Sequence, residues 1–259
     1  MTVKNIPLCL ILLVAHNCFG VGNIISNNAG NGVEILNSSI GNVVQGDAIG
    51  TDFAGNIDFG NGGAGVFIAG FSTGNLIGGT GLGQGNLIAH NLKGVVVGVD
   101  ATDLSVSNSI LSNSIYKNDI KIGIDLANDG STLNHAVNPF TGPNNFQNYP
   151  VLGTPIITQI GLSVPWILHS RPSSSFILQF FRNLPNDPEG RLLFSQVTVT
   201  TDANGDTSGT LSVPGGVPLN SAITATATYV VADEVLDTSE FGSTVYAVVN
   251  QCLPRSCNR

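Results

Sequence analysis

The chain has 259 residues, of which only 10% are charged while 32 are glycine, and its formal net charge is −8 at pH 7. Helical domains usually contain more Glu, Lys, Arg and Leu, so this composition favours an all-β protein. Nucleic-acid binding needs a basic surface that neutralises phosphates, and the negative charge argues against a nucleic-acid partner.

Residues 1–20 are predicted to be a signal peptide. Lys4 precedes an apolar run over 6–15, and cleavage after Gly20 would place small residues at the positions that signal peptidases require. The run is too short to span a bilayer and no other stretch comes close, so no transmembrane segment is expected in the mature chain. The pattern predicts a secreted or cell-surface protein; the alternatives for this segment are a buried first strand or an imperfect gene start.

Two short sequence units recur between residues 22 and 130. The first is Asn followed by apolar or small residues and then Gly or Asn, at 22–27, 42–46, 75–79, 85–91 and 108–113. The second is Gly-Val/Ile-x-aliphatic, at 32–35, 65–68, 94–97 and 123–126. Their spacing is loose and centred on about 22 residues, which predicts four or five coils of a right-handed parallel β-helix over residues 21–152.

The glycines and asparagines of these units have distinct physical roles. Glycine provides the positive φ angles of the turns between strands. Asparagine tolerates the same conformation and can also stack on its equivalents in neighbouring coils as a ladder of side-chain amides. A ladder of this kind explains why 20 asparagines lie between Asn23 and Asn148.

A solenoid needs both of its ends covered, because terminal coils otherwise expose apolar core and strand edges. The Pro- and Asn-rich segment 134–152 is predicted to wrap the C-terminal end. For the N-terminal end three explanations stay open: the signal-like segment remains as a cap, the end associates with another chain such as a second copy, or the gene model has lost upstream coils.

The pattern changes after residue 152 to longer alternating strands separated by turn signals, such as 176–181, 196–201 and 222–229. Such strands predict an immunoglobulin-like β-sandwich over residues 153–249. In the tail, 250–259, we expect Cys252 and Cys257 to form a disulfide in an oxidising compartment, with two free thiols as the alternative.

Together these segments resemble a family of bacterial secreted or surface proteins that join right-handed parallel β-helix repeats, of the pectate-lyase-like superfold, to a C-terminal immunoglobulin-like sandwich. The residues that carry the resemblance include Ile49-Gly-Thr-Asp52, Gly123-Ile-Asp-Leu126, Gly142-Pro-Asn-Asn145, Val199-Thr-Thr-Asp-Ala-Asn-Gly205 and Thr238-Ser-Glu-Phe241. The resemblance implies a fold and export rather than one activity, since many members have no assigned activity.

Parallel β-helices that act on polysaccharides resemble one another in placing two or three carboxylates on one outward sheet, and a lyase adds a calcium ion and a basic side chain. The central residues of the second unit are expected to form an outward column of Glu34, Phe67, Val96 and Asp125. Apolar positions separate its two acids, so the column predicts no close pair of carboxylates.

Weak catalytic candidates gather near the last coil, where lysine lies beside carboxylates: Lys117, Asp119, Lys121, Asp125 and Asp129. They could act as a lyase base with a Ca²⁺ site; the alternative is that they are charges on a solvated face. We assign no metal ligand and no cofactor from the sequence.

The leading hypothesis is a secreted or cell-surface protein that binds a glycan or another component of the cell envelope, or has a structural role, without catalysis. One alternative is a polysaccharide lyase or glycosidase that works on the outer face of the β-helix. The other is a truncated remnant of a longer surface protein.

Overall fold

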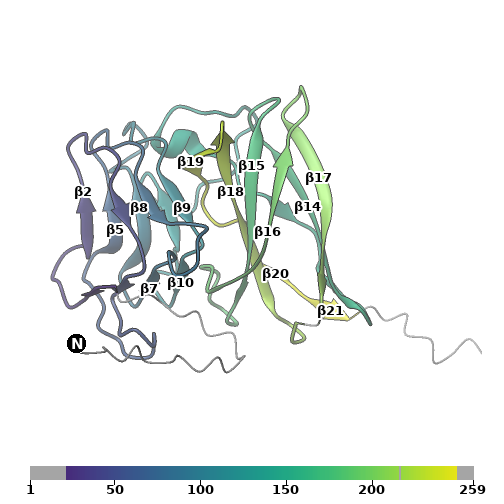
Figure 1. Ribbon diagram of the computed structural model, residues 1–259, viewed down its shortest axis with the longest axis horizontal. Coiled ribbons are helices and arrows are strands. Elements are labelled where there is room, and N and C mark those ends of the chain that lie inside the picture. The colour runs from purple at the N-terminus through teal and green to yellow at the C-terminus, as the bar shows by residue number, and fades with distance from the viewer. Residues whose placement is uncertain (1–21, 216, 250–259) are drawn as a thin grey trace, which may run out of the picture.

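The computed structural model describes residues 22–215 and 217–249, which form an all-β protein. The chain begins as a parallel β-solenoid of about three turns and continues into two sheets of mostly longer, antiparallel strands (Figure 1). The predicted signal peptide and the predicted disulfide of Cys252 and Cys257 lie outside the described residues. Among the described residues, no helix has the length and apolar character needed to cross a membrane.

Three parallel sheets form the walls of the solenoid. Sheet one contains, in spatial order, β1 (Ile24–Ile25), β4 (Ala48–Ile49), β7 (Leu87–Ala89) and β10 (Ser114–Tyr116). Sheet two contains β2 (Val33–Ile35), β5 (Ala64–Ile68), β8 (Lys93–Val97) and β11 (Ile124–Leu126). Sheet three contains β3 (Val43–Val44), β6 (Leu76–Gly78) and β9 (Ser109–Leu111).

Aliphatic side chains stack in register inside the solenoid. In sheet one, Ile49, Ile88 and Ile115 occupy equivalent positions, and in sheet three Ile77 lies next to Ile110. All five belong to one buried hydrophobic cluster. Strands of two to five residues suffice here, because each one adds an aliphatic side chain to this stacked core.

The coils are longer than the sequence units suggested. Equivalent residues in neighbouring coils lie 24 to 39 positions apart, rather than about 22. The prediction of four or five coils is therefore wrong, and about three turns are observed. The cause is that the first sequence unit contributes to sheet one at Asn23 and Asn86 but to sheet three at Asn42, Asn75 and Asn108.

The predicted asparagine ladder is confirmed, and three ladders are present. They run through Asn23, Asp47, Asn86 and Asn113; through Asn28, Asn61, Asn91 and Asn118; and through Asn42, Asn75, Asn108 and Asn144. At most rungs the backbone N–H and the Nδ2 of one residue both donate to the Oδ1 of its equivalent one coil later. Asn61, for example, donates to Asn91 at 3.2 and 2.8 Å. The ladders therefore have a direction, with donors facing the C-terminal end.

Two further sheets follow the short 3₁₀ helix η1 (Pro143–Phe146). Sheet four contains β12 (Val151–Leu152), β14 (Gly161–His169), β13 (Ile156–Ile157) and β21 (Val248–Val249), with β17 (Asp206–Pro214) also paired to β14. Sheet five contains β16 (Leu192–Thr200), β15 (Ser175–Asn183), β18 (Ala222–Val231) and β19 (Glu234–Thr238), with β20 (Val245–Tyr246) paired to β18. Trp166 of sheet four and Phe180 of sheet five belong to one buried cluster.

The last coil of the solenoid is covered by polar groups from the C-terminal half. We call residues 187–190 and 236–240 the cap segments. Glu189 accepts hydrogen bonds from both the backbone N–H and the Nδ2 of Asn118, at 2.8 and 3.0 Å. It therefore takes the place of the next ladder residue. Glu240 accepts the backbone N–H of Leu126 at 2.8 Å. Figure 1 shows β19 beside β9, where Thr238 Oγ1 accepts the N–H of Ile110.

The segment 134–152 covers a smaller part of this end. Asn144 accepts the backbone N–H of Asn108 at 3.0 Å and thereby ends the third ladder. Phe146 packs into the solenoid core. The sequence thus pointed to one of the covering segments but to neither cap segment.

Burial changes the titration of both cap glutamates. It is the main cause that raises the pKa of Glu240 from its ordinary 4.5 to about 8, and the charge of Asp125 acts in the same direction. Burial also raises the pKa of Glu189, with a further contribution from Asp187. Both side chains therefore bind a proton more tightly in the folded chain than in the unfolded chain.

Removing one buried rung should lower stability strongly. Asn91→Ala deletes the acceptor of the Asn61 N–H and Nδ2, and it leaves these donors buried without a partner. We expect the free energy of unfolding in urea to fall by about 3 kcal/mol. The control is Asn56→Ala, because Asn56 is exposed, and it should change stability by less than about 0.5 kcal/mol. Equal losses in the two variants would contradict a structural role for the ladder.

Stability should fall as the pH rises from about 4.5 to about 8 and then level off, because the folded chain keeps the Glu240 proton through this window while the unfolded chain releases it. The slope expected from one such group is about 1.4 kcal/mol per pH unit. His169, whose pKa Asp206 raises, adds to the fall near neutral pH. Urea titrations should therefore show a flatter slope for Glu240→Gln and an unaltered slope for the exposed control Glu234→Gln.

Candidate functional site

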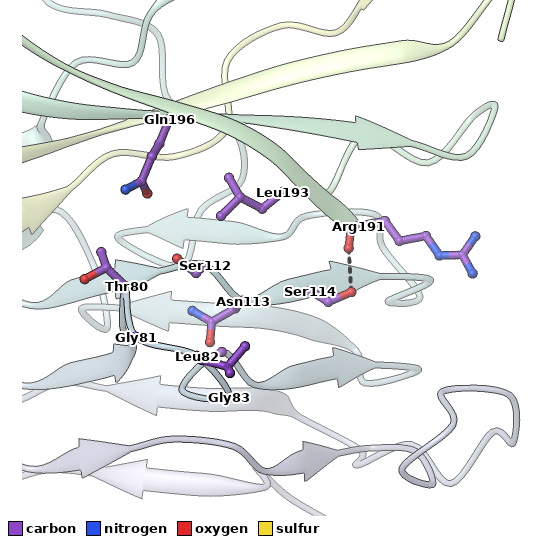
Figure 2. A pocket seen from close by; sticks show the side chains of 11 residues that line it. Thr80, Gly81, Leu82, Gly83, Ser112, Asn113, Ser114, Arg191, Leu193 and Gln196 are labelled. Carbon is purple, nitrogen blue, oxygen red and sulfur yellow. Dashed lines mark hydrogen bonds between the residues drawn. The ribbon is translucent and has the colours of Figure 1, made fainter. Parts of the chain in front are cut away.

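A groove of about 430 Å³ lies between the solenoid and sheet five (Figure 2). The solenoid side consists of the loop after β6 and the segment that joins β9 to β10, and the other side is the start of β16. The lining residues are Thr80, Gly81, Leu82, Gly83, Gly85, Ser112, Asn113, Ser114, Arg191, Leu193 and Gln196. The groove therefore depends on the contact between the two halves of the chain.

The loop on the solenoid side is held by a glutamine that folds back on it. The Gln84 side chain accepts the backbone N–H of Gly81 at 2.7 Å, and the Gln84 N–H donates to the Gly81 carbonyl. Gly79 has a φ of +153°, a conformation that favours glycine, and a Cβ there would displace the Gln84 side chain, whose Oε1 would lie 2.5 Å away. Leu82, at the tip of this loop, is 98% exposed.

The floor of the groove is anchored by hydrogen bonds that are wholly or partly buried. Asn113 is the last residue of the first ladder, and its Nδ2 donates to the Ile77 carbonyl at 2.9 Å. Gln179 of β15 donates to both Ser112 Oγ and Gln196 Oε1, at 2.9 and 3.0 Å. These bonds fix the polar side chains before any ligand arrives, which lowers the entropy lost on binding.

Arg191 contributes to the groove mainly through its backbone. Its carbonyl accepts the Ser114 hydroxyl at 2.5 Å, and its N–H donates to Asn183 Oδ1 at 2.8 Å. The guanidinium lies over the Tyr116 ring, 4.8 Å from its centroid. Figure 2 shows this side chain directed away from Leu193 and Gln196. The interior is consequently uncharged, with hydroxyls and amides beside two leucines.

The sequence candidates lie elsewhere, and Asp125 is the most buried of them. Its side chain is 0% exposed and pairs with Lys93 Nζ at 2.6 Å. Lys93 Nζ also donates to the carbonyl and Oδ1 of Asn128, at 3.2 and 2.7 Å. Gly130 N–H approaches the other oxygen of Asp125 at 3.3 Å. This carboxylate is enclosed by the loop that follows β11.

The other four candidates are exposed. Lys117 and Lys121 have φ angles of +54° and +55°, so they occupy turn positions. Asp119 and Asp129 are also exposed. Among the ion pairs of the described residues, none joins these four side chains to Asp125.

The expected column of Glu34, Phe67, Val96 and Asp125 is in register across sheet two. The residues on either side of each column position belong to the core cluster or pack against it and the column residues do not, as expected for an outward column. Val96 and Asp125 are nevertheless buried. Asp125 is buried because Lys93 and the loop after β11 cover it. The alternation of inward and outward residues along a single strand does not reveal this cover.

A second cavity, of about 200 Å³, lies where β11 meets the second cap segment, and Lys121, Tyr149 and Glu240 contribute to its lining. Burial raises the pKa of Tyr149 above its ordinary value. Across residues 22–215 and 217–249, no group of three or more His, Cys, Asp or Glu side chains gathers as metal ligands. No protein-family model matches the chain.

Sequence reasoning missed the groove residues and Lys93. Lys93 comes 32 residues before Asp125, one coil earlier, and it adjoins the second unit at 94–97. The register of β8 with β11 places Val96 beside Asp125, and Lys93 lies three positions earlier on β8, so the pair forms through the reach of the lysine side chain along the strand. Arg191, Leu193 and Gln196 carry no comparable signal, because their contact with the solenoid joins segments about 80 residues apart.

Breaking the Lys93–Asp125 pair should destabilise the fold. Asp125→Ala leaves the ammonium of Lys93 partly buried without its carboxylate, so we expect a loss of about 3 to 5 kcal/mol in the free energy of unfolding. Replacing both residues, as Lys93→Met with Asp125→Leu, should cost less than Asp125→Ala alone. The exposed control Asp129→Ala should remain within about 0.5 kcal/mol of the wild type. A neutral effect of Asp125→Ala would refute this structural role.

Proposed function

We propose that the protein is a secreted or cell-surface β-helix protein that binds a neutral glycan, without catalysis, in the groove between the solenoid and sheet five. The observation that supports the proposal is the lining of this groove, where hydroxyls and amides surround two leucines. Its volume of about 430 Å³ falls within the usual range of small-molecule sites.

Sugars suit such a lining because each ring carries hydroxyls around its edge and C–H groups on its faces. Thr80, Ser112 and Gln196 offer groups that donate and accept hydrogen bonds. Leu82 and Leu193 offer apolar surface for the ring faces. Since the Arg191 guanidinium points out of the groove, a neutral sugar fits better than a charged one.

Export and the C-terminal architecture belong to the same proposal. The pattern of residues 1–20 supports secretion. An immunoglobulin-like sandwich for residues 153–249 is supported by the hydrophobic cluster that sheets four and five share. In this arrangement the sandwich would have two roles, since it caps the solenoid and forms one wall of the glycan site.

Glycan-array binding, followed by calorimetry on the best neutral oligosaccharide, tests the proposal. Leu82→Ser and Gln196→Ala should each weaken binding about tenfold, equivalent to about 1.4 kcal/mol. The control is Ile160→Ser, because Ile160 is 87% exposed and lies in the turn between β13 and β14.

Background signal for the folded wild type, or equal affinity in all three variants, would overturn the proposal. The bound oligosaccharide should be recovered intact. Release of new reducing or unsaturated ends would instead favour the lyase or glycosidase alternative.

A further inference from the structure

The first coil of the solenoid presents three strand edges at one end of the molecule. β1, β2 and β3 are each the terminal strand of their sheet. Among the described residues, no further strand pairs with their outer edges. We call this surface, formed by residues 22–46, the end face. Strand edges of this kind bind other strands through unpaired N–H and C=O groups.

The ladders also end here, and their direction gives the face its chemistry. Asn23, Asn28 and Asn42 are exposed, and each donates forward into the next coil. Their own Oδ1 atoms accept no hydrogen bond from the described residues. An amide carries donor and acceptor groups together, so each of these side chains can pair with its own copy.

The apolar core is also less covered at this end. Ile24, Val43 and Ile40 are 49%, 59% and 74% exposed. Ile25 and Val44, which point into the core, are only partly buried. At the opposite end, Phe146 and Phe241 close the same core. The end face thus combines apolar surface with strand edges that pair with no other strand among residues 22–215 and 217–249.

The end face is almost free of charge, although the chain carries a net charge of −8. Glu34 is the one charged side chain among residues 22–46, and its carboxylate accepts a hydrogen bond from Asn31 Nδ2 at 2.8 Å. Two copies can therefore approach through this face with little of the repulsion that their net charges cause elsewhere.

We propose that the end face binds the end face of a second copy of this chain, head to head across a two-fold axis. Head-to-tail stacking is blocked because the cap segments already occupy the other end of the solenoid. Antiparallel pairing of two identical edges is self-complementary, since N–H and C=O groups alternate along each edge. This interface is independent of the proposed glycan groove.

Sedimentation velocity of the full chain over a wide concentration range tests the proposal. The wild type should form a dimer. Val43→Lys should raise its dissociation constant at least about tenfold, because a lysine on an edge strand opposes pairing. The matched control is Ile167→Lys, because Ile167 lies on β14 and is 57% exposed. This substitution adds the same charge at a position away from the end face. Circular dichroism spectra and Tm measurements serve to check that both variants fold.

The substitution Glu34→Gln provides a second test, in which the dimer is expected to become more stable rather than less stable. The variant removes the one like charge that the two copies bring together, so the dimer should become about two- to fivefold tighter. Amide exchange at Ile24 and Val43 should also slow as the protein concentration rises.

A wild type that stays monomeric at every concentration would overturn the proposal. This holds whether the amides of the edge strands exchange rapidly with solvent or are protected by another segment of the same chain. The same holds if Val43→Lys and Ile167→Lys shift the equilibrium equally.

Discussion

The asparagine ladders run in one direction, and the remaining architecture follows from that constraint. Each rung donates its backbone N–H towards the C-terminal end, and most rungs donate Nδ2 as well, so the last coil presents buried donors that need acceptors. A buried donor without an acceptor lowers the free energy of unfolding by about as much as one complete rung raises it. The solenoid is therefore complete only when an acceptor-rich surface covers this end. Glu189, Glu240 and Asn144 provide it.

The cap explains why the two halves form one structure and why a groove lies between them. Glu189 is two residues before Arg191, so the same short segment ends the second ladder and begins the wall of the groove. Gln179 links the halves again, because its side chain bonds to both Ser112 and Gln196. Loss of the cap would consequently remove the candidate binding site as well as the end of the ladder.

Local sequence was a good guide to features that repeat and a poor one to contacts across long separations. Glycine followed by alternating aliphatics located β5, β8 and β11 correctly, since one coil suffices to show the pattern. Counting coils failed because Asn23 and Asn42 look alike yet belong to different sheets. The Lys93–Asp125 pair required the coil length, and Gln196 required the packing of sheet five on the solenoid.

The residues that carried the family resemblance have a physical explanation. Gly142-Pro-Asn-Asn145 contains Asn144, which ends one ladder. Thr238-Ser-Glu-Phe241 contains Glu240, which accepts a hydrogen bond from the Leu126 N–H, and Phe241, which packs against the core. These motifs are short and far apart, and sequence alone gave no reason for them to occur together. Their common role at the last coil provides that reason.

The position of the cap late in the chain also bears on how the protein is made. Synthesis delivers the solenoid first, and Glu240 follows Asn118 by more than a hundred residues. At the usual pace of translation, several seconds or more separate the two. A solenoid that folded during this interval would carry open strand edges at its unfinished end, and such edges are prone to aberrant pairing. A chain that stayed extended until its closing residues had been made would avoid this stage.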